Sequence, residues 1–96
     1  MEKLMIPEQD ICNAVCVYIA REKHVEPSEV EVELIYDDEE GFSAEAFING
    51  QKQVLSHLNL IQALRLWIDE FLNRDPFAAG IELHLDDEEG IFAAIR

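Results

Sequence analysis

Hydrophobic residues recur along the chain with two spacings, one typical of helices and one typical of strands. Two stripes have the helical spacing, namely Ile11, Val15, Tyr18 and Ile19 in the first, and Leu60, Ile61, Leu64, Trp67, Ile68 and Phe71 in the second. Pro7 suits the first position of the first helix, and Ser56 is a candidate N-cap for the second. Both helices should end before a proline, at Pro27 and Pro76.

Each predicted helix is followed by two runs in which hydrophobic and polar residues alternate, the pattern of a half-buried strand. These runs occupy 30–36 and 42–48 after the first helix, and 81–85 and 91–95 after the second. The same five residues, Asp-Asp-Glu-Glu-Gly, join the strands of each pair at 37–41 and 86–90. The glycine provides the positive φ that a hairpin turn requires, so both pairs are predicted to be hairpins.

A short apolar stretch precedes each predicted helix, at 4–6 and at 54–55. Asn49-Gly50 is a turn signal between the second strand and the later of these stretches. It could form a further hairpin between 47–48 and 54–55, although the sequence leaves open whether the opening stretches pair as strands.

The chain aligns with itself without a gap when it is shifted by 49 residues, and 12 of the 47 aligned pairs are identical. This predicts a single domain, 1–96, made of two repeats, 1–49 and 50–96. The predicted fold is α+β: a β-α-β-β unit occurs twice, giving one antiparallel sheet with two helices on one face and pseudo-twofold symmetry. A half of this length buries too little surface to fold alone.

The chain has 96 residues, with 21 Asp and Glu against 7 Lys and Arg, for a net charge of −14. Such acidity argues against direct nucleic-acid binding, because phosphate neutralisation needs clustered basic residues. The 49% share of hydrophobic residues argues against a disordered acidic chain. No apolar run approaches the length of a membrane span and no signal peptide is evident, so the expected location is the cytoplasm.

No residue pattern points to catalysis, to a cofactor or to a defined metal site, so an enzyme is not expected. The two acidic runs are interpreted as solvated hairpin turns, with weak cation binding as the alternative. Cys12 and Cys16 are interpreted as buried structural thiols, with a metal site completed by a histidine as the alternative.

Several hydrophobic residues stand where polar ones are expected. Val17 and Leu66 occupy aligned places on the polar sides of the two helices, and Ile35, Phe47, Phe92 and Ala94 fall on the strand face directed away from the helices. An apolar sheet face needs covering, and a second copy of the chain would cover it. We therefore predict a small acidic, non-enzymatic protein-interaction domain that forms a homodimer through Val17, Leu66, Ile35, Phe47 and Phe92.

Three other interpretations remain open at this point. Scattered apolar residues on a monomer would need no explanation. The partner could be another protein that is basic or that accepts an apolar patch, with the acidic turns steering its approach. The alternative function is a metal- or small-ligand-binding module with a site between the two repeats.

Three segments carry a resemblance to a known family: Cys16-Val17-Tyr18, the strand run 30–34 (Val-Glu-Val-Glu-Leu), and 41–45 (Gly-Phe-Ser-Ala-Glu). Together they resemble the YxcD-like family of small uncharacterised proteins from Bacillus-type bacteria, over nearly the whole chain. The resemblance implies a cytoplasmic protein of unknown role. It assigns no functional residue to this sequence.

Overall fold

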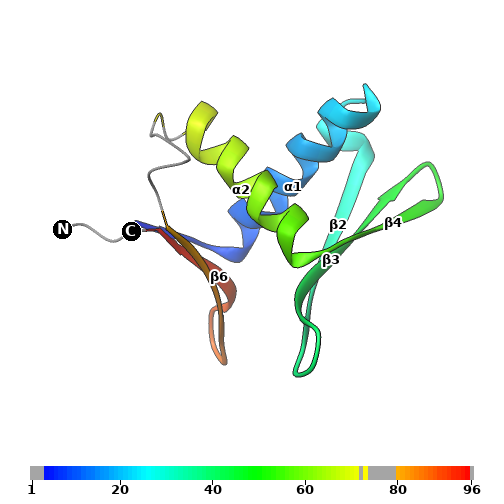
Figure 1. Ribbon diagram of the computed structural model, residues 1–96. Helices are drawn as coiled ribbons and strands as arrows, with labels where there is room; N and C mark the ends of the chain where they lie inside the picture. Colours follow the sequence, from blue (N-terminus) through cyan, green and yellow to red (C-terminus); the bar gives the residue numbers. More distant parts are fainter. Residues whose placement is uncertain (1–3, 72, 74–79, 96) are drawn as a thin grey trace.

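The computed structural model describes residues 4–71, 73 and 80–95. Its elements are, in chain order, β1 (Leu4–Ile6), α1 (Glu8–Lys23), a 3-10 turn (Pro27–Glu29), β2 (Val30–Asp37), β3 (Gly41–Ile48), β4 (Gln51–Leu55), α2 (His57–Phe71), β5 (Ile81–Asp86) and β6 (Gly90–Ile95). The fold is therefore α+β, and the predicted order β-α-β-β is found twice. The two helices cross on one side of the molecule (Figure 1). The β2–β3 hairpin and the β5–β6 hairpin both extend away from them.

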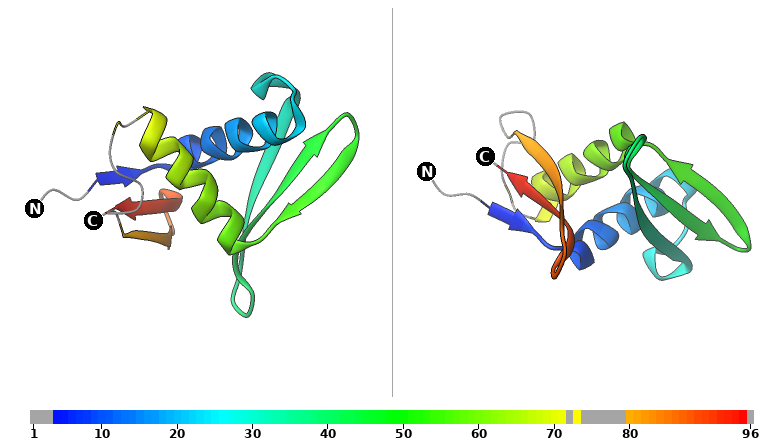
Figure 2. Two further views of the ribbon diagram at one scale, coloured as in Figure 1. Left: turned by 45° about the horizontal axis from the view of Figure 1, so that its top comes forward. Right: turned by 90° about the horizontal axis from the view of Figure 1, so that it is seen from below.

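The strands form two antiparallel sheets, ordered β1–β6–β5 and β2–β3–β4, so the predicted single sheet is wrong. The sheets stand at separate ends of the helix pair (Figure 2). Leu34 and Phe42 from one sheet and Leu83 from the other each pack against both hydrophobic cores. The inner faces of the two sheets therefore meet at these three side chains.

In each sheet, a strand from one half of the chain pairs with a strand from the other half, where the halves are 1–49 and 50–96. β4 completes the sheet of the first half, where Leu55 lies opposite Ala44, and β1 completes the sheet of the second half, where Ile6 lies opposite Ala93. Ile6 precedes Leu55 by 49 residues, and Ala93 follows Ala44 by 49 residues. The two pairs therefore occupy equivalent positions in the two halves. A shift of 49 likewise places every β5–β6 pair on a β2–β3 pair.

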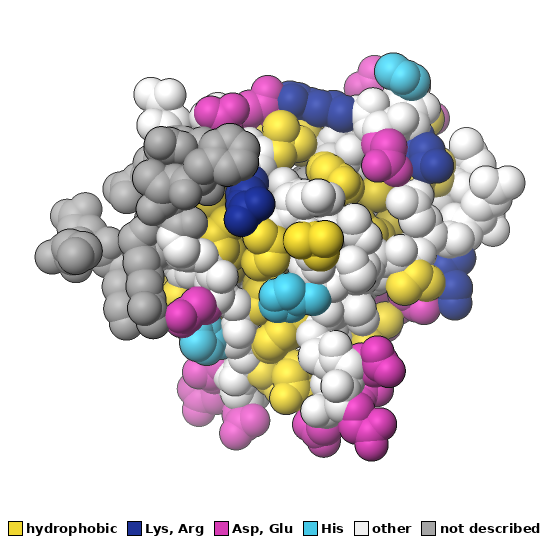
Figure 3. All heavy atoms as spheres, viewed as in Figure 1, with side chains coloured by type: hydrophobic (Ala, Val, Ile, Leu, Met, Phe, Trp, Pro, Cys, Tyr) yellow, Lys and Arg dark blue, Asp and Glu magenta, His cyan; other side chains and the backbone are white. Residues whose placement is uncertain are grey.

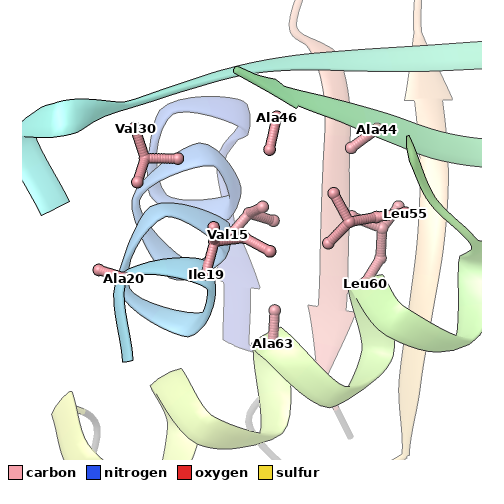
Figure 4. Close-up of a cluster of buried hydrophobic side chains, with 9 residues drawn as sticks. All are labelled: Val15, Ile19, Ala20, Val30, Ala44, Ala46, Leu55, Leu60 and Ala63. Carbon is pink, nitrogen blue, oxygen red and sulfur yellow. The ribbon is translucent and has the colours of Figure 1, made fainter. Parts of the chain in front are cut away.

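Each hydrophobic core also draws on both halves. The first core takes Val15, Ile19, Ala20, Val30, Ala44 and Ala46 from the first half, and Leu55, Leu60 and Ala63 from the second. Figure 4 shows these side chains converging between the sheet and both helices. The second core combines Ile6, Ile11 and Ala14 with Leu64, Ile68, Ile91, Ala93 and Ile95. The N-terminal part of each helix thus serves one core and its C-terminal part serves the other.

The helix ends follow local capping chemistry. Ser56 caps α2 as predicted, because its Oγ accepts a hydrogen bond from the Asn59 N–H at 3.3 Å. Pro7 precedes α1 instead of occupying its first position, and its carbonyl accepts the N–H groups of Asp10 and Ile11. His24 directly follows α1 as its C-cap and has the left-handed conformation (φ 59°), so this helix ends before Pro27 as predicted. Pro76 lies outside the described residues.

The turn at Asn49-Gly50 joins β3 to β4, so the predicted further hairpin is present, but its register differs from the prediction. Phe47 and Ile48 lie opposite residues 51–52, and the 54–55 stretch lies opposite 44–45. Both residues have positive φ, 51° and 81°, as a two-residue hairpin loop of type I′ requires. The opening stretches do pair as strands, since β1 and β4 each form the edge of a sheet.

We expect residues 1–49 and 50–96, produced as separate fragments, to be unfolded alone and to fold when mixed. Each fragment lacks the strand and the helix turns that close its core, so too little apolar surface is buried. Circular dichroism and thermal unfolding of each fragment, and of an equimolar mixture, provide the measurement. Cooperative unfolding of either fragment on its own would contradict this picture of shared cores.

Candidate functional site

The five residues predicted to form an interaction surface are all half-buried, and the structure distributes them over three places. Val17 and Leu66 lie on the two helices. Ile35 and Phe47 lie on the outer face of the β2–β3–β4 sheet, and Phe92 lies on the outer face of the other sheet. They therefore do not form one continuous surface.

Val17 and Leu66 lie on helix faces that turn toward the partner helix. Arg21, one turn after Val17, forms an ion pair with Glu70, one turn after Leu66. Residues four apart share a helix face, so Val17 and Leu66 point toward the same side as this ion pair. Tyr18 donates a second contact between the helices, from its hydroxyl to Gln62 Oε1 at 3.1 Å. Val17 and Leu66 therefore lie beside the contact between the two helices, and their participation in an interface stays a prediction.

The outer face of the β1–β6–β5 sheet combines apolar side chains with few charges. Met5 is 58% exposed and lies opposite Ala94 across the β1–β6 ladder. Phe92 stacks on His84, with ring centroids 5.2 Å apart. Met5 and Phe92, with Pro7 and Glu89, also line a recess of about 230 Å³.

The outer face of the β2–β3–β4 sheet is more highly charged. Val54 is 64% exposed there, beside the ion pair of Lys52 with Glu45 at 3.1 Å. Glu31 and Glu33 alternate with the core-facing residues of β2 and share this outer face with Ile35 and Phe47. The two sheets therefore present chemically different outer surfaces.

The predicted acidic turns are confirmed as hairpin turns with exposed carboxylates. We define them as residues 37–40 and 86–89, and all eight side chains are exposed. Asp37 Oδ1 accepts the N–H groups of Glu39 at 2.7 Å and Glu40 at 3.3 Å. Asp86 makes the same two bonds with Glu88 and Glu89, at 2.7 and 3.1 Å. These hydrogen bonds hold the pKa of both aspartates below the ordinary value of 3.8.

The lowered pKa sets the sign of a pH effect. Asp37 stabilises the folded state above pH 3.8, and this contribution is lost as the pH falls through the lower folded-state value. We expect Asp37→Asn to lower the thermal unfolding midpoint at neutral pH, and this difference to be smaller at an acidic pH below 3.8, where the carboxylate becomes protonated. Asp38→Asn, with the same change in charge, serves as the control. An Asp37→Asn effect of equal size at both pH values would contradict the assignment.

Cys12 and Cys16 are half-buried free thiols on α1, so they are less enclosed than predicted. Burial, followed by the charge of Glu8 and the presence of Cys16, raises the pKa of Cys12 from 9.0 to about 11. Burial also raises the pKa of Cys16, whose Sγ lies 3.5 Å from the Val30 carbonyl oxygen. Among the described residues, no three His, Cys, Asp or Glu side chains form a group able to hold a metal ion.

The raised pKa predicts an unreactive thiol at Cys12. In a Cys16→Ser variant, Cys12 should react with iodoacetamide at neutral pH at least about tenfold more slowly than in the denatured chain, because its raised pKa leaves a smaller fraction of thiolate. Mass spectrometry of timed samples measures the rate. Equal rates in the folded and denatured protein would show that the thiol is not protected.

The sequence interpretation missed the most exposed hydrophobic side chains of the strands. Met5, Tyr36, Val54 and Leu85 are each between 42% and 64% exposed. The shift of 49 residues was the available signal, because it aligns Met5 with Val54 and Tyr36 with Leu85. Tyr36 and Leu85 immediately precede the acidic turns.

Comparison with known proteins gives a family for the chain. Residues 1–88 match the sequence profile described as "Protein of unknown function (DUF2653)". The chain belongs to this family.

One relative within the curated proteins supports the same assignment. The chain is 32% identical over 94 residues to "Uncharacterized protein YxcD" of Bacillus subtilis (strain 168), covering 97% of this chain and 92% of the relative. The resemblance to YxcD-like proteins is therefore confirmed. No solved structure matches the chain. Neither helix in the described part of this DUF2653 protein combines the length and the apolar character needed to cross a membrane.

Proposed function

We propose that this DUF2653 protein is a small, acidic, cytoplasmic protein-interaction domain that acts without catalysis. The observation that carries the proposal is the set of large hydrophobic side chains left exposed on its strands, with Met5 and Val54 on the outer faces of the two sheets. Exposed apolar groups beside charged ones are typical of surfaces that bind other proteins.

The first proposed interaction is self-association through the outer face of the β1–β6–β5 sheet. This face presents Met5, Phe92 and Ala94, with Glu82 and His84 on its β5 edge. It suits contact between two copies better than the outer face of the other sheet, because each copy has a net charge of −14 and like charges repel. The glutamates on β2 and β3 make that other face costly to bury.

A twofold arrangement would bring the two Phe92 rings and their neighbours together, since the commonest dimers bury the same patch on both copies. Covering this face would bury additional apolar surface, and a domain of this length buries only a modest fraction of its surface by itself. The Met5–Phe92 recess of about 230 Å³ offers space for a side chain of the second copy.

We also infer that the two halves are copies of one β-α-β-β unit, related by a pseudo-twofold axis. The coincident strand registers support this inference. So do two local features that recur 49 residues apart, namely the left-handed residues His24 and Asn73 and the hydrogen-bonded turns at Asp37 and Asp86.

The self-association proposal is tested by Phe92→Asp. Light scattering after gel filtration should give about twice the 11.0 kDa chain mass for the wild type and about the chain mass for the variant, because a charge at the centre of an apolar contact is strongly unfavourable.

Phe47→Asp is the matched control, because it introduces the same charge on the outer face of the other sheet. It should leave the dimer intact. A monomeric wild type, or a Phe92→Asp variant that remains dimeric, would refute self-association through this face.

A further inference from the structure

Hydrophobic side chains also converge between the two sheets, on the side opposite the helices. Leu34, Phe42 and Leu83 pack against both cores and so mark the place where the inner faces of the sheets meet. Tyr36 and Leu85 are the next inward-facing residues along β2 and β5, toward the acidic turns. We call these five residues the junction patch.

The outer part of the junction patch is open to solvent. Tyr36 is 42% exposed and Leu85 is 52% exposed. The Tyr36 ring is held edge-on against Phe42, with centroids 4.9 Å apart, so the patch presents a fixed aromatic surface. A tyrosine side chain that is already held in place binds a partner at a low cost in conformational entropy.

Carboxylates border the junction patch on both sides. The β2–β3 and β5–β6 hairpins each end in an acidic turn, and Figure 3 shows hydrophobic side chains between these two groups of Asp and Glu. An occupant of the patch therefore meets apolar contacts in the middle and negative charge on both flanks.

We propose that the junction patch binds a basic amphipathic helix of another protein. Such a helix has one apolar stripe for Tyr36 and Leu85, and it can carry lysine or arginine along both sides of that stripe. An extended segment matches the site less well, because its side chains alternate between two opposite faces. Its backbone, and not basic side chains, would then lie beside the acidic turns. A second copy of this chain is also disfavoured, because its own acidic turns would approach these ones.

This proposal rests on the interaction role proposed above, but it uses a different surface from the outer face of the β1–β6–β5 sheet. Charge attraction should speed the encounter and weaken with added salt. The apolar contacts should distinguish an amphipathic helix from other basic peptides of the same composition.

The probe is a fluorescein-labelled peptide of leucine and lysine, roughly 18 residues long, with leucine at helical i, i+3, i+4 and i+7 spacing. A second peptide of identical composition has the leucines scattered around the helix. Fluorescence anisotropy measures the binding of both peptides to the full-length protein at low and at moderate salt.

The protein variants are Tyr36→Asn with Leu85→Asn, and Val54→Asn as the matched control. Val54 is 64% exposed but lies on the opposite face of its sheet from the patch. We expect the amphipathic peptide to bind the wild type and the Val54→Asn variant equally, and the double variant at least about tenfold more weakly. Leu85→Asn alone replaces the double variant if the latter does not show cooperative thermal unfolding.

Three results would overturn the proposal: no binding of the amphipathic peptide to the wild type at low salt, equal binding of the two peptides, or unchanged binding after the patch substitutions. Light scattering on the same samples separates the two proposals. A dimer that persists without peptide binding refutes only the junction patch, whereas peptide binding by a monomer refutes only self-association.

Discussion

The structure depends on one constraint, which is that neither half of the chain can enclose a hydrophobic core alone. The hairpin of the first half and the C-terminal part of its helix are covered by Leu55, Leu60 and Ala63, which all come from the second half. The other core is completed in the same way by Ile6, Ile11 and Ala14. Apolar burial is the main favourable term in folding, so sharing both cores makes folding of the two halves interdependent.

The sharing also positions the surfaces. Each helix contributes its first turns to one core and its last turns to the other, so the helices must cross between the sheets. That crossing holds the sheets apart and directs both acidic turns to the same side (Figure 1). The junction patch therefore arises from the way the cores are built and needs no additional element to hold it in place.

Local features of this fold could be predicted from the sequence, because they depend on neighbouring residues. The Ser56 cap, the Asn49-Gly50 turn and the acidic hairpin turns each have a short sequence signature. The single sheet was wrong because strand alternation gives which side chains share a face, but not which edges pair. The pairing of β1 with β6 joins opposite ends of the chain, and no local pattern encodes it.

The candidate site was predicted only in part for the same reason. Phe92 and Phe47 stood out because both break the expected hydrophobic-in, polar-out alternation. Tyr36 and Leu85 did not, since both obey that alternation and resemble core residues in the sequence. They are exposed because their strands continue beyond the helices, and only the tertiary structure reveals where the covering layer ends.

An ion pair between residues 49 apart in the sequence shows how two linked halves of one chain can differ. A shift of 49 places Arg21 on Glu70, and these two side chains form an ion pair with each other. Two separate identical units would bring like charges together at this place, whereas two linked halves can differ. The same freedom allows Tyr36 on one side of the junction patch and Leu85 on the other. A patch with unlike sides can fix the direction in which a bound helix lies, which a perfectly symmetric one cannot do.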